Sequence, residues 1–324
     1  MRRALFAMMM VLALAAGRAQ VMATHPFAAE MERARSLEAG ATATDVPHHV
    51  HYELNLYNRK GKLTTGTWDI WRDPQHATRM EIVAGDFRYT RIHDLVRNVE
   101  WRRFNTVMPL KVYDLRQNYA EPAYAVAQFG AGEAKHDVHF RQVEGSPFEC
   151  TDVVVPVGIC FDPLAHVLAF AQMYNQTVAW EDWQPVGLHS VARRFRIYDA
   201  GQVMVEATGT VEVVKSFPSV LFVIPADEPD MGEPEDTFGT SGGASPHQVV
   251  GMKTVEIEPL YGNALVQIAV SADGKVKKAS VIDADDDDIV HDAEEFAKGL
   301  VFAPEIKAGV AVPFEEFIYL RHAP

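Results

Sequence analysis

The chain has little cysteine, a deficit of basic charge and no apolar run of the length that spans a membrane. Its 324 residues include 30 Lys and Arg against 44 Asp and Glu, a net charge of −14, and only two cysteines. Broad nucleic-acid binding needs a positive footprint, and anionic lipid repels an acidic surface. We therefore expect no nucleic-acid partner and no adsorption to anionic membranes.

The sequence also lacks the short motifs that mark common catalytic centres. It contains no G-x-S-x-G nucleophile elbow, no H-E-x-x-H zinc helix, no P-loop and no dinucleotide fingerprint. We predict no catalytic residues, no cofactor and no metal. A hydrolase or other enzyme built on the larger domain is the alternative, and a purely structural envelope protein is a third interpretation.

The first 19 residues have the three-part pattern of a secretory signal peptide. Arg2 and Arg3 give a positive start, residues 4–16 are apolar, and small residues lead up to Ala19. The apolar run is shorter than the roughly 20 residues that cross a bilayer. We predict cleavage after Ala19 and a periplasmic or secreted protein. An uncleaved membrane anchor is the alternative.

Cys150 and Cys160 are the only cysteines, and the nine residues between them can fold back on themselves. An even number of cysteines in an exported protein favours a disulfide over free thiols. The spacing is not C-x-x-C, and two isolated thiols make a poor metal site. We predict a structural disulfide between them.

A polar–apolar alternation starts near residue 49 and indicates a sheet. It repeats in four segments separated by turn residues, so we predict an antiparallel meander of strands. These segments are His49 to Tyr57, Leu63 to Trp71, Thr78 to Val83 and Phe87 to Ile92. The other elements expected before residue 225 are helices at 26–43, 105–124 and 163–174 and strands at 138–143, 148–155, 191–197, 202–214 and 221–224.

Composition divides the chain into four predicted parts. Residues 225–246 are rich in Pro, Gly and acidic side chains and contain few apolar ones, so they can bury little and should form a linker. We predict a signal peptide at 1–19, a sheet domain at 20–224, this acidic linker at 225–246 and a small terminal domain at 247–324.

The terminal domain shows the order strand, turn, strand, helix, strand. Leu265 to Val270 precedes an Asp-Gly pair, in which Gly274 supplies the positive φ of a hairpin turn. A helix is expected from Ile289 to Leu300, with an apolar face made by Ala293, Phe296, Ala297 and Leu300. An aromatic-x-Pro triplet at 302–304, a Gly-x-x-Val turn at 309–312 and a closing strand Phe314 to Leu320 follow.

This order resembles the C-terminal domain of TonB-type energy-transducing proteins, which works by protein recognition. The resemblance implies a small α+β domain whose sheet edge accepts a strand from a partner. We predict that edge to be the last strand, with Phe314, Phe317 and Tyr319 as its contacts. The expected partner is an envelope protein, such as an outer-membrane protein. A short linker and a cleaved signal exclude coupling of two membranes, and a purely structural accessory domain is the alternative.

The larger domain resembles the lipoprotein-carrier family, periplasmic half-barrels that ferry acylated proteins. The resemblance rests on a Gly-led strand at 66–71, a third strand at 78–82 that bears Arg79, and a following aromatic residue. It implies an α+β fold in which a curved antiparallel half-barrel sheet and covering helices enclose an apolar cavity. We expect a lipid or acyl ligand there. The predicted ligand-binding residues are Trp68, Ile70, Met80, Ile82 and Trp101.

Three charged clusters have two interpretations each. His49 and His51 would share a strand face, with His48 on the other, as metal ligands or as an exposed strand entry. The acidic run 283–288 could bind Ca²⁺, but without the glycine and spacing of a calcium loop it better fits a solvated helix start. A basic region could meet an acidic partner or lipid headgroup, although local ion pairs are favoured. Its residues are Arg88, Arg91, Arg97, Arg102 and Arg103.

Overall fold

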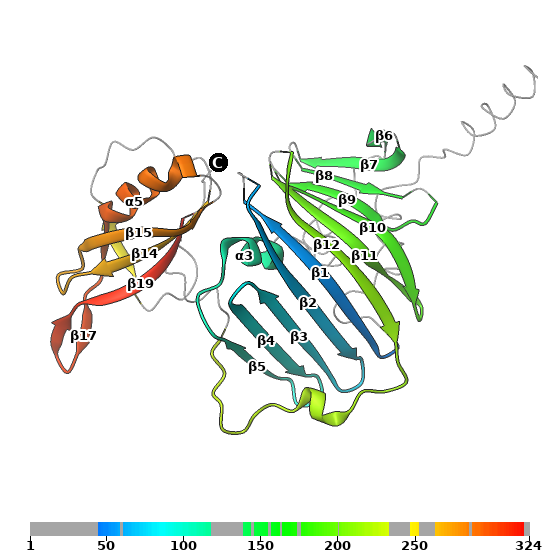
Figure 1. Ribbon diagram of the computed structural model, residues 1–324, viewed down its shortest axis with the longest axis horizontal. Coiled ribbons are helices and arrows are strands. Elements are labelled where there is room, and N and C mark those ends of the chain that lie inside the picture. The colour runs from blue at the N-terminus through cyan, green and yellow to red at the C-terminus, as the bar shows by residue number, and fades with distance from the viewer. Residues whose placement is uncertain are drawn as a thin grey trace, which may run out of the picture.

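A computed structural model shows a twelve-stranded antiparallel sheet beside a smaller α+β unit (Figure 1). It describes residues 45–58, 61–117, 139–143, 146–154, 157–162, 164–173, 176–199, 201–232, 247–252, 263–284 and 287–320. The predicted signal peptide, the helix expected at 26–43 and most of the predicted linker lie outside these ranges. Within the described ranges, no helix combines the length and the hydropathy needed to cross a bilayer.

The large sheet consists of two meanders that meet at its centre. Its strand order is β5-β4-β3-β2-β1-β12-β11-β10-β9-β8-β7-β6, so the first and last strands of the unit are neighbours. The first meander is β1 (His48–Tyr57), β2 (Leu63–Asp73), β3 (Ala77–Ala84), β4 (Phe87–Asp94) and β5 (Val99–Phe104). The second is β6 (His139–Val143), β7 (Ser146–Val154), β8 (Val157–Phe161), β9 (Leu168–Met173), β10 (Gln176–Val186), β11 (His189–Asp199) and β12 (Gln202–Val213).

Alternation correctly predicted most of these strands. The four predicted strands of the first meander lie within β1 to β4, and the predictions at 191–197 and 202–214 correspond to β11 and β12. The helix expected at 163–174 is wrong, because Leu168–Met173 pairs between β8 and β10 as β9. The strand expected at 221–224 is also wrong, since Ser219–Phe222 forms a short 3-10 helix, η1.

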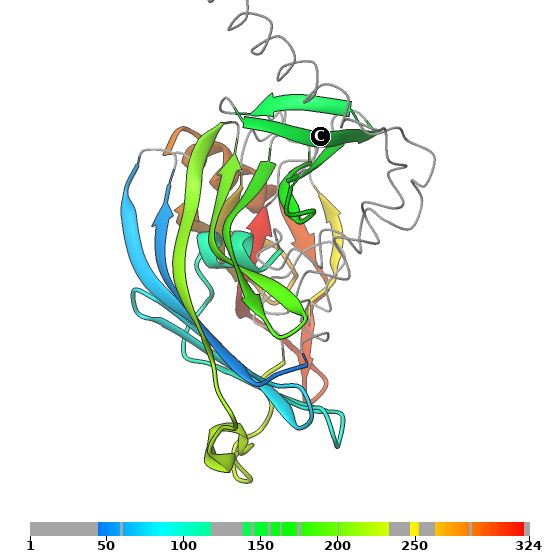
Figure 2. The same ribbon diagram turned by 90° about the vertical axis from the view of Figure 1, so that its right-hand side faces the viewer.

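The sheet curves around one short helix, α3 (Leu110–Gln117), which lies on its concave side (Figure 2). Met108, Leu110, Val112 and Leu115 are fully buried in the core cluster that covers this side of the sheet. The helix expected at 105–124 therefore begins only after Pro109, whose carbonyl accepts the first hydrogen bonds of α3. We call the side that contacts α3 the concave face and the other the convex face.

The predicted disulfide is confirmed. Cys150 on β7 and Cys160 on β8 stand directly opposite each other in the hairpin, and their Sγ atoms are bonded. Both side chains are buried. The bond therefore fixes the register of the second meander near its outer end.

Reducing this disulfide should lower the free energy of unfolding by about 3 kcal/mol, because a closed loop of this size restricts the unfolded chain by that amount. Urea titrations with and without a reductant measure the change. A Cys150→Ser/Cys160→Ser variant serves as the control and should show no response to the reductant. Equal midpoints for the oxidised and reduced wild type would contradict the prediction.

The smaller unit, residues 264–320, has the predicted element order. It contains β14 (Ala264–Val270), β15 (Val276–Ala284), the 3-10 helix η3 (Asp287–Ile289), α5 (Val290–Gly299), β16 (Leu300–Phe302), β17 (Glu305–Lys307), β18 (Val310–Val312) and β19 (Phe314–Leu320). Gly274 has the expected positive φ in the β14–β15 turn. β13 (Val249–Met252) pairs with β16, and β17 with β18 forms a separate two-stranded arm.

Its main sheet has the order β15-β14-β19, and its two faces are buried in different places. Val266, Ile268 and Ile318 face α5 in a core cluster of their own. Leu265 and Tyr319, on the opposite face, belong to the core cluster of the large sheet. The smaller unit is therefore packed against the large one rather than only tethered to it.

Candidate ligand-binding face

The concave face of the large sheet is apolar over most of its width. The alternate residues of β1 that face inward, Val50, Tyr52, Leu54 and Leu56, are all buried. Their cross-strand neighbours are of the same kind. The predicted ligand residues Trp68, Ile70, Met80 and Ile82 lie on this face, because each stands opposite an inward-facing residue of the adjacent strand. The sequence correctly grouped these four side chains.

An aromatic cluster forms the centre of this face. The ring centroids of Tyr52 and Trp68 are 5.8 Å apart, and the Phe195 ring meets both edge-on at 5.3 and 6.2 Å. Trp180 stands directly opposite Phe195 in the β10–β11 pair. The phenol of Tyr52 donates a hydrogen bond of 2.5 Å to the carbonyl of Ala192. The cluster thus packs aromatic side chains of the two meanders against one another.

A glycine makes room for this arrangement. Gly209 on β12 is the cross-strand partner of Tyr52. A Cβ atom on Gly209 would lie 2.5 Å from Cδ1 of Tyr52 and 2.7 Å from the carbonyl oxygen of His51. The Tyr52 ring therefore lies across the bare backbone of β12, which lets its hydroxyl reach Ala192 on β11.

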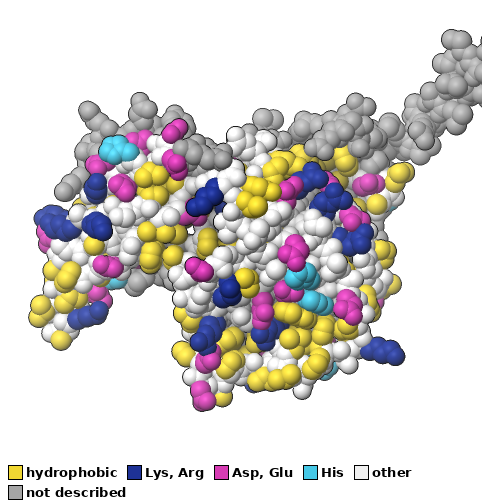
Figure 3. Space-filling model, viewed as in Figure 1, with side chains coloured by type: hydrophobic (Ala, Val, Ile, Leu, Met, Phe, Trp, Pro, Cys, Tyr) yellow, Lys and Arg dark blue, Asp and Glu magenta, His cyan; other side chains and the backbone are white. Residues whose placement is uncertain are grey.

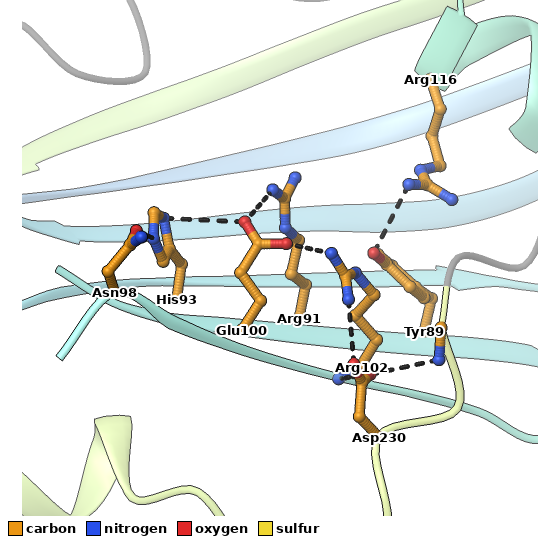
Figure 4. Close-up of polar contacts among 9 residues, drawn as sticks. Tyr89, Arg91, His93, Asn98, Glu100, Arg102, Arg116 and Asp230 are labelled. Atoms are coloured by element: carbon orange, nitrogen blue, oxygen red, sulfur yellow. Dashed lines mark hydrogen bonds and ion pairs between the residues drawn. The ribbon is translucent and has the colours of Figure 1, made fainter.

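Polar side chains gather at one end of the concave face, on β4 and β5 (Figure 4). Glu100 pairs with Arg91 at 2.5 Å and also with Arg102, while Nδ1 of His93 lies 3.7 Å from the same carboxylate. From α3, the guanidinium of Arg116 sits over the Tyr89 ring, 4.5 Å from its centroid. The apolar face thus ends in a network of arginines that share one carboxylate.

Acidic residues that follow β12 complete this network. We call residues 214–232 the strap, because they leave β12 and run along the sheet to β5 (Figure 1). Asp230 pairs with Arg102 at 3.0 Å, and Glu228 pairs with Arg103. The amide of Arg102 donates to Asp230, and its carbonyl accepts from the amide of Met231. The strap therefore covers the edge of the sheet, which would otherwise expose unpaired backbone groups.

These contacts favour the interpretation of the basic region as local ion pairs for four of its five arginines. Arg91 and Arg102 pair with Glu100, Arg97 with Asp94 at 2.6 Å, and Arg103 with Glu228. Arg88 donates to the carbonyls of Gly85 and Phe87. The sequence could not predict the acidic partners in the strap, which lie more than a hundred positions away.

Trp101 is the predicted ligand residue that the structure places elsewhere. It stands opposite Ile92, on the convex face, whereas its neighbours Glu100 and Arg102 point to the concave side. Its indole nitrogen donates a hydrogen bond of 3.1 Å to the carbonyl of Glu228 in the strap. Trp101 therefore anchors the strap, and the concave face does not include it.

The three histidines divide between the faces as predicted. His49 and His51 lie on the convex face, where Nε2 of His49 and Nδ1 of His51 each donate to the same carboxylate oxygen of Asp69 at 2.8 Å. The ring of His49 also stacks on Trp71, with centroids 4.7 Å apart. Hydrogen bonds and charge attraction from Glu53 and Asp69 raise the pKa of His51. Asp69 comes from the neighbouring strand, so the spacing of the histidines alone gave no sign of it.

The described residues contain no group of ligands suited to a metal ion, at the histidines or elsewhere. On the surface seen in Figure 3, histidines and side chains of both charges are mixed with apolar ones. This face of the large sheet therefore carries charged side chains and histidines among apolar ones, whereas the centre of the concave face is an aromatic cluster.

The three predicted partner contacts on β19 already have partners within the chain. The Tyr319 ring lies 4.3 Å from that of Tyr113 on α3, and Phe317 packs against the core of the large sheet. Phe314 stacks on His247 at 3.6 Å. β19 is nonetheless an edge strand, paired with β14 alone among the described strands. A partner strand would therefore pair with the backbone of β19 more than with these three side chains.

The smaller unit also provides the N-terminal cap of α3. Pro109, just before the helix, has no side chain that can accept a hydrogen bond from the first turn. Instead, Oδ2 of Asp283 on β15 accepts from the amide of Leu110 at 3.1 Å. The sequence predicts that the acidic run 283–288 serves the start of its own helix. Asp287 and Asp288 do lie there, in η3, but Asp283 stabilises a helix of the other unit.

Replacing Asp283 with alanine should destabilise the protein by about 1 kcal/mol, the usual loss for an N-cap residue. It should also speed hydrogen exchange at Leu110. Thermal unfolding and amide exchange measure the two effects. The control is Glu315→Ala, which removes the same charge from an exposed position on β19. A similar loss in both variants would show that the cap contributes nothing beyond charge.

Comparison with known proteins gives a structural similarity without a sequence match. No family model and no curated protein matches the chain. Among solved structures, it is similar to a domain described as an outer membrane lipoprotein-sorting protein from Vibrio parahaemolyticus, with 9% identity and a TM-score of 0.35 over 60% of this chain and 94% of that one. A LolA superfamily protein from Nitrosomonas europaea is similar at 9% identity and a TM-score of 0.36, over 60% of this chain and 96% of that one.

A DUF1329 family protein from Desulfovibrio piger is similar at 10% identity and a TM-score of 0.33, over 60% of this chain and 94% of that one. The chain is therefore structurally similar to LolA-superfamily and DUF1329 proteins over 60% of its length. The comparisons give no support to the predicted resemblance of residues 247–324 to a TonB C-terminal domain.

Proposed function

We propose that this protein is an exported, non-catalytic binding protein of the cell envelope that holds a lipid or acyl ligand on the concave face. The observation that supports the proposal is the contrast between the two faces of one sheet. Apart from the arginine network on β4 and β5, the concave face is mainly aromatic and aliphatic, while the convex face carries ion pairs and histidines. A surface that is apolar and curved around a short helix suits a ligand with a long hydrocarbon part.

The disulfide agrees with an oxidising compartment, where such bonds persist. The proposed division of labour follows the predicted domains, with the sheet domain before the acidic linker as the ligand carrier. Trp68, Ile70, Met80 and Ile82 are the proposed ligand contacts. Arg91 and Arg116 lie at the polar end of the same face, where the polar group of an amphiphile would meet solvent.

Native mass spectrometry of the protein purified from its own cells tests the ligand. The wild type should carry copurified lipid, and Met80→Lys should lose it, because a charge on the partly buried concave position opposes burial of an apolar chain. Thr90→Lys, at a partly buried position on the convex face, is the matched control and should keep the lipid. Lipid-free wild type, or equal loss in both variants, would refute the proposal.

We further propose that the smaller unit binds an envelope protein by strand addition at β19. Support comes from the edge position of β19 and from the exposed side chain of Glu315 on it. A photo-cross-linking residue at Glu315 of the full chain should give an adduct with one envelope protein in living cells. The same residue at Lys298, on the α5 side, should not. Adducts from both sites or from neither would count against strand addition.

A further inference from the structure

Three indole groups in the concave face have a hydrogen-bond donor but no acceptor. The Nε1 atoms of Trp68, Trp180 and Trp183 are withdrawn from solvent and have no acceptor among the described residues. Trp68 and Trp180 are only 3% and 2% exposed. A buried indole N–H normally finds a partner, because leaving it without one costs free energy. Three unsatisfied donors of one kind therefore require an explanation.

The three donors belong to one place in the fold. The Trp68 ring meets the edge of Phe195, and Trp180 stands opposite Phe195 in the β10–β11 pair. Trp183 stands opposite Ala192, the residue whose carbonyl accepts from Tyr52. All three thus surround the aromatic cluster at the centre of the face where the ligand is proposed to bind.

Two other aromatic donors of the large sheet have acceptors within the chain. The hydroxyl of Tyr52 has its acceptor at Ala192, and the indole of Trp101 on the convex face donates to Glu228. The local backbone can therefore supply acceptors to aromatic donors. Among the described residues, the indoles of Trp68, Trp180 and Trp183 lack such acceptors, as do ring nitrogens of His48 and His189. A phenylalanine would fill each indole position without any unsatisfied donor.

We propose that these indoles recognise oxygen acceptors on the ligand, so that the ligand is an acyl compound rather than a plain hydrocarbon. Ester, amide or carboxyl oxygens would accept hydrogen bonds from Trp68 and Trp180, while the chain lies along Val50, Ile70 and Ile82. The inference rests on the proposed ligand-binding function of the concave face. It adds that this face distinguishes ligands by their carbonyl group and not by chain length alone.

Competition with a neutral fluorescent probe, N-phenyl-1-naphthylamine, tests this selectivity. The full chain should bind a long-chain methyl ester about tenfold more tightly than the alkane of equal length, as two modest hydrogen bonds allow. Trp68→Phe and Trp180→Phe should each weaken ester binding by about threefold and leave alkane binding unchanged. Trp101→Phe is the matched control and should change neither affinity.

A second measurement on the wild type does not depend on the folding of a variant. In nitrogen-15 spectra of indole-labelled protein, the ester should shift at least two of the five indole N–H signals downfield, and the alkane should not. Equal affinity for ester and alkane, with no such shift, would overturn the inference and leave the proposed function intact. Failure of both ligands to displace the probe would refute both.

Discussion

Gly209→Ala should lower the free energy of unfolding by about 3 kcal/mol, the upper range for forcing extra atoms into a packed core. The added Cβ would lie 2.5 Å from Cδ1 of Tyr52 and 2.7 Å from the carbonyl oxygen of His51. The Tyr52 ring could turn away only by losing its contacts with Trp68 and Phe195 and its hydrogen bond to Ala192. The carbonyl belongs to β1, so relieving that contact would open the β1–β12 pair.

Urea unfolding and near-ultraviolet circular dichroism measure this effect, since a displaced Tyr52 changes the aromatic signal as well as stability. Gly251→Ala is the matched control. It places the same methyl group on a strand, β13, where nothing lies within 4 Å. An equal and small loss in both variants would show that β12 can move away from the Tyr52 ring without cost.

The second large effect concerns acid stability and His48. This side chain is fully buried on the concave side of β1, and burial lowers its pKa to about 4. A backbone hydrogen bond to Val46 opposes that shift, whereas the nearby charges of Arg72 and His49 add to it. In the unfolded chain the imidazole keeps its ordinary pKa near 6.5. Between these two values the unfolded state therefore binds a proton that the folded state does not.

Stability should fall as the pH drops from about 6.5 to about 4, and the loss from His48 alone should reach about 3 kcal/mol below that range. His48→Gln should remove this contribution, so that the free energy of unfolding falls less steeply as the pH drops. His51 acts in the opposite direction, because its raised pKa stabilises the fold at low pH and the benefit disappears as the pH rises through that pKa.

Unfolding free energies measured at several pH values for the wild type, His48→Gln and His51→Gln test both signs. The slope, not the absolute stability, is the readout, so a general loss from the substitution does not confuse the result. An acid limb of unchanged slope in His48→Gln would show that other groups control acid unfolding.

The sequence predicts those parts of the fold that depend on residues close together along the chain. Alternation defined β1 to β4, and the Asp-Gly turn at Gly274 defined the β14–β15 hairpin. The prediction of a helix where β9 lies is wrong, because Leu168, Ala169 and Ala171 favour helices when considered alone. Pairing with strands on both sides overrides that preference in the sheet.

The candidate site was predictable only in part, for the same reason. Residues of one strand, such as Trp68 and Ile70, share a face by parity, which the sequence displays. Trp101 was assigned to the wrong face because its orientation depends on the register between β4 and β5. Asp230, which pairs with Arg102, lies in the strap, and Asp69, which contacts His51, lies on the neighbouring strand. Asp283, which caps α3 at Leu110, belongs to the other unit. No spacing along the chain reveals these three partners.

The pairing of β1 with β12, which joins the two meanders, affects the order in which the chain becomes structured. β1 pairs with β12, so the two meanders can each form from local contacts, but they join only after residue 213 has left the ribosome or the export channel. Until then the central strand β1 is itself an open edge. The far edge, β5, stays open for about as long, because Glu228 and Asp230 are the residues that close it. A single stretch of nineteen residues after β12, the strap, therefore ends the period in which the β5 edge of the nascent sheet could pair with another chain.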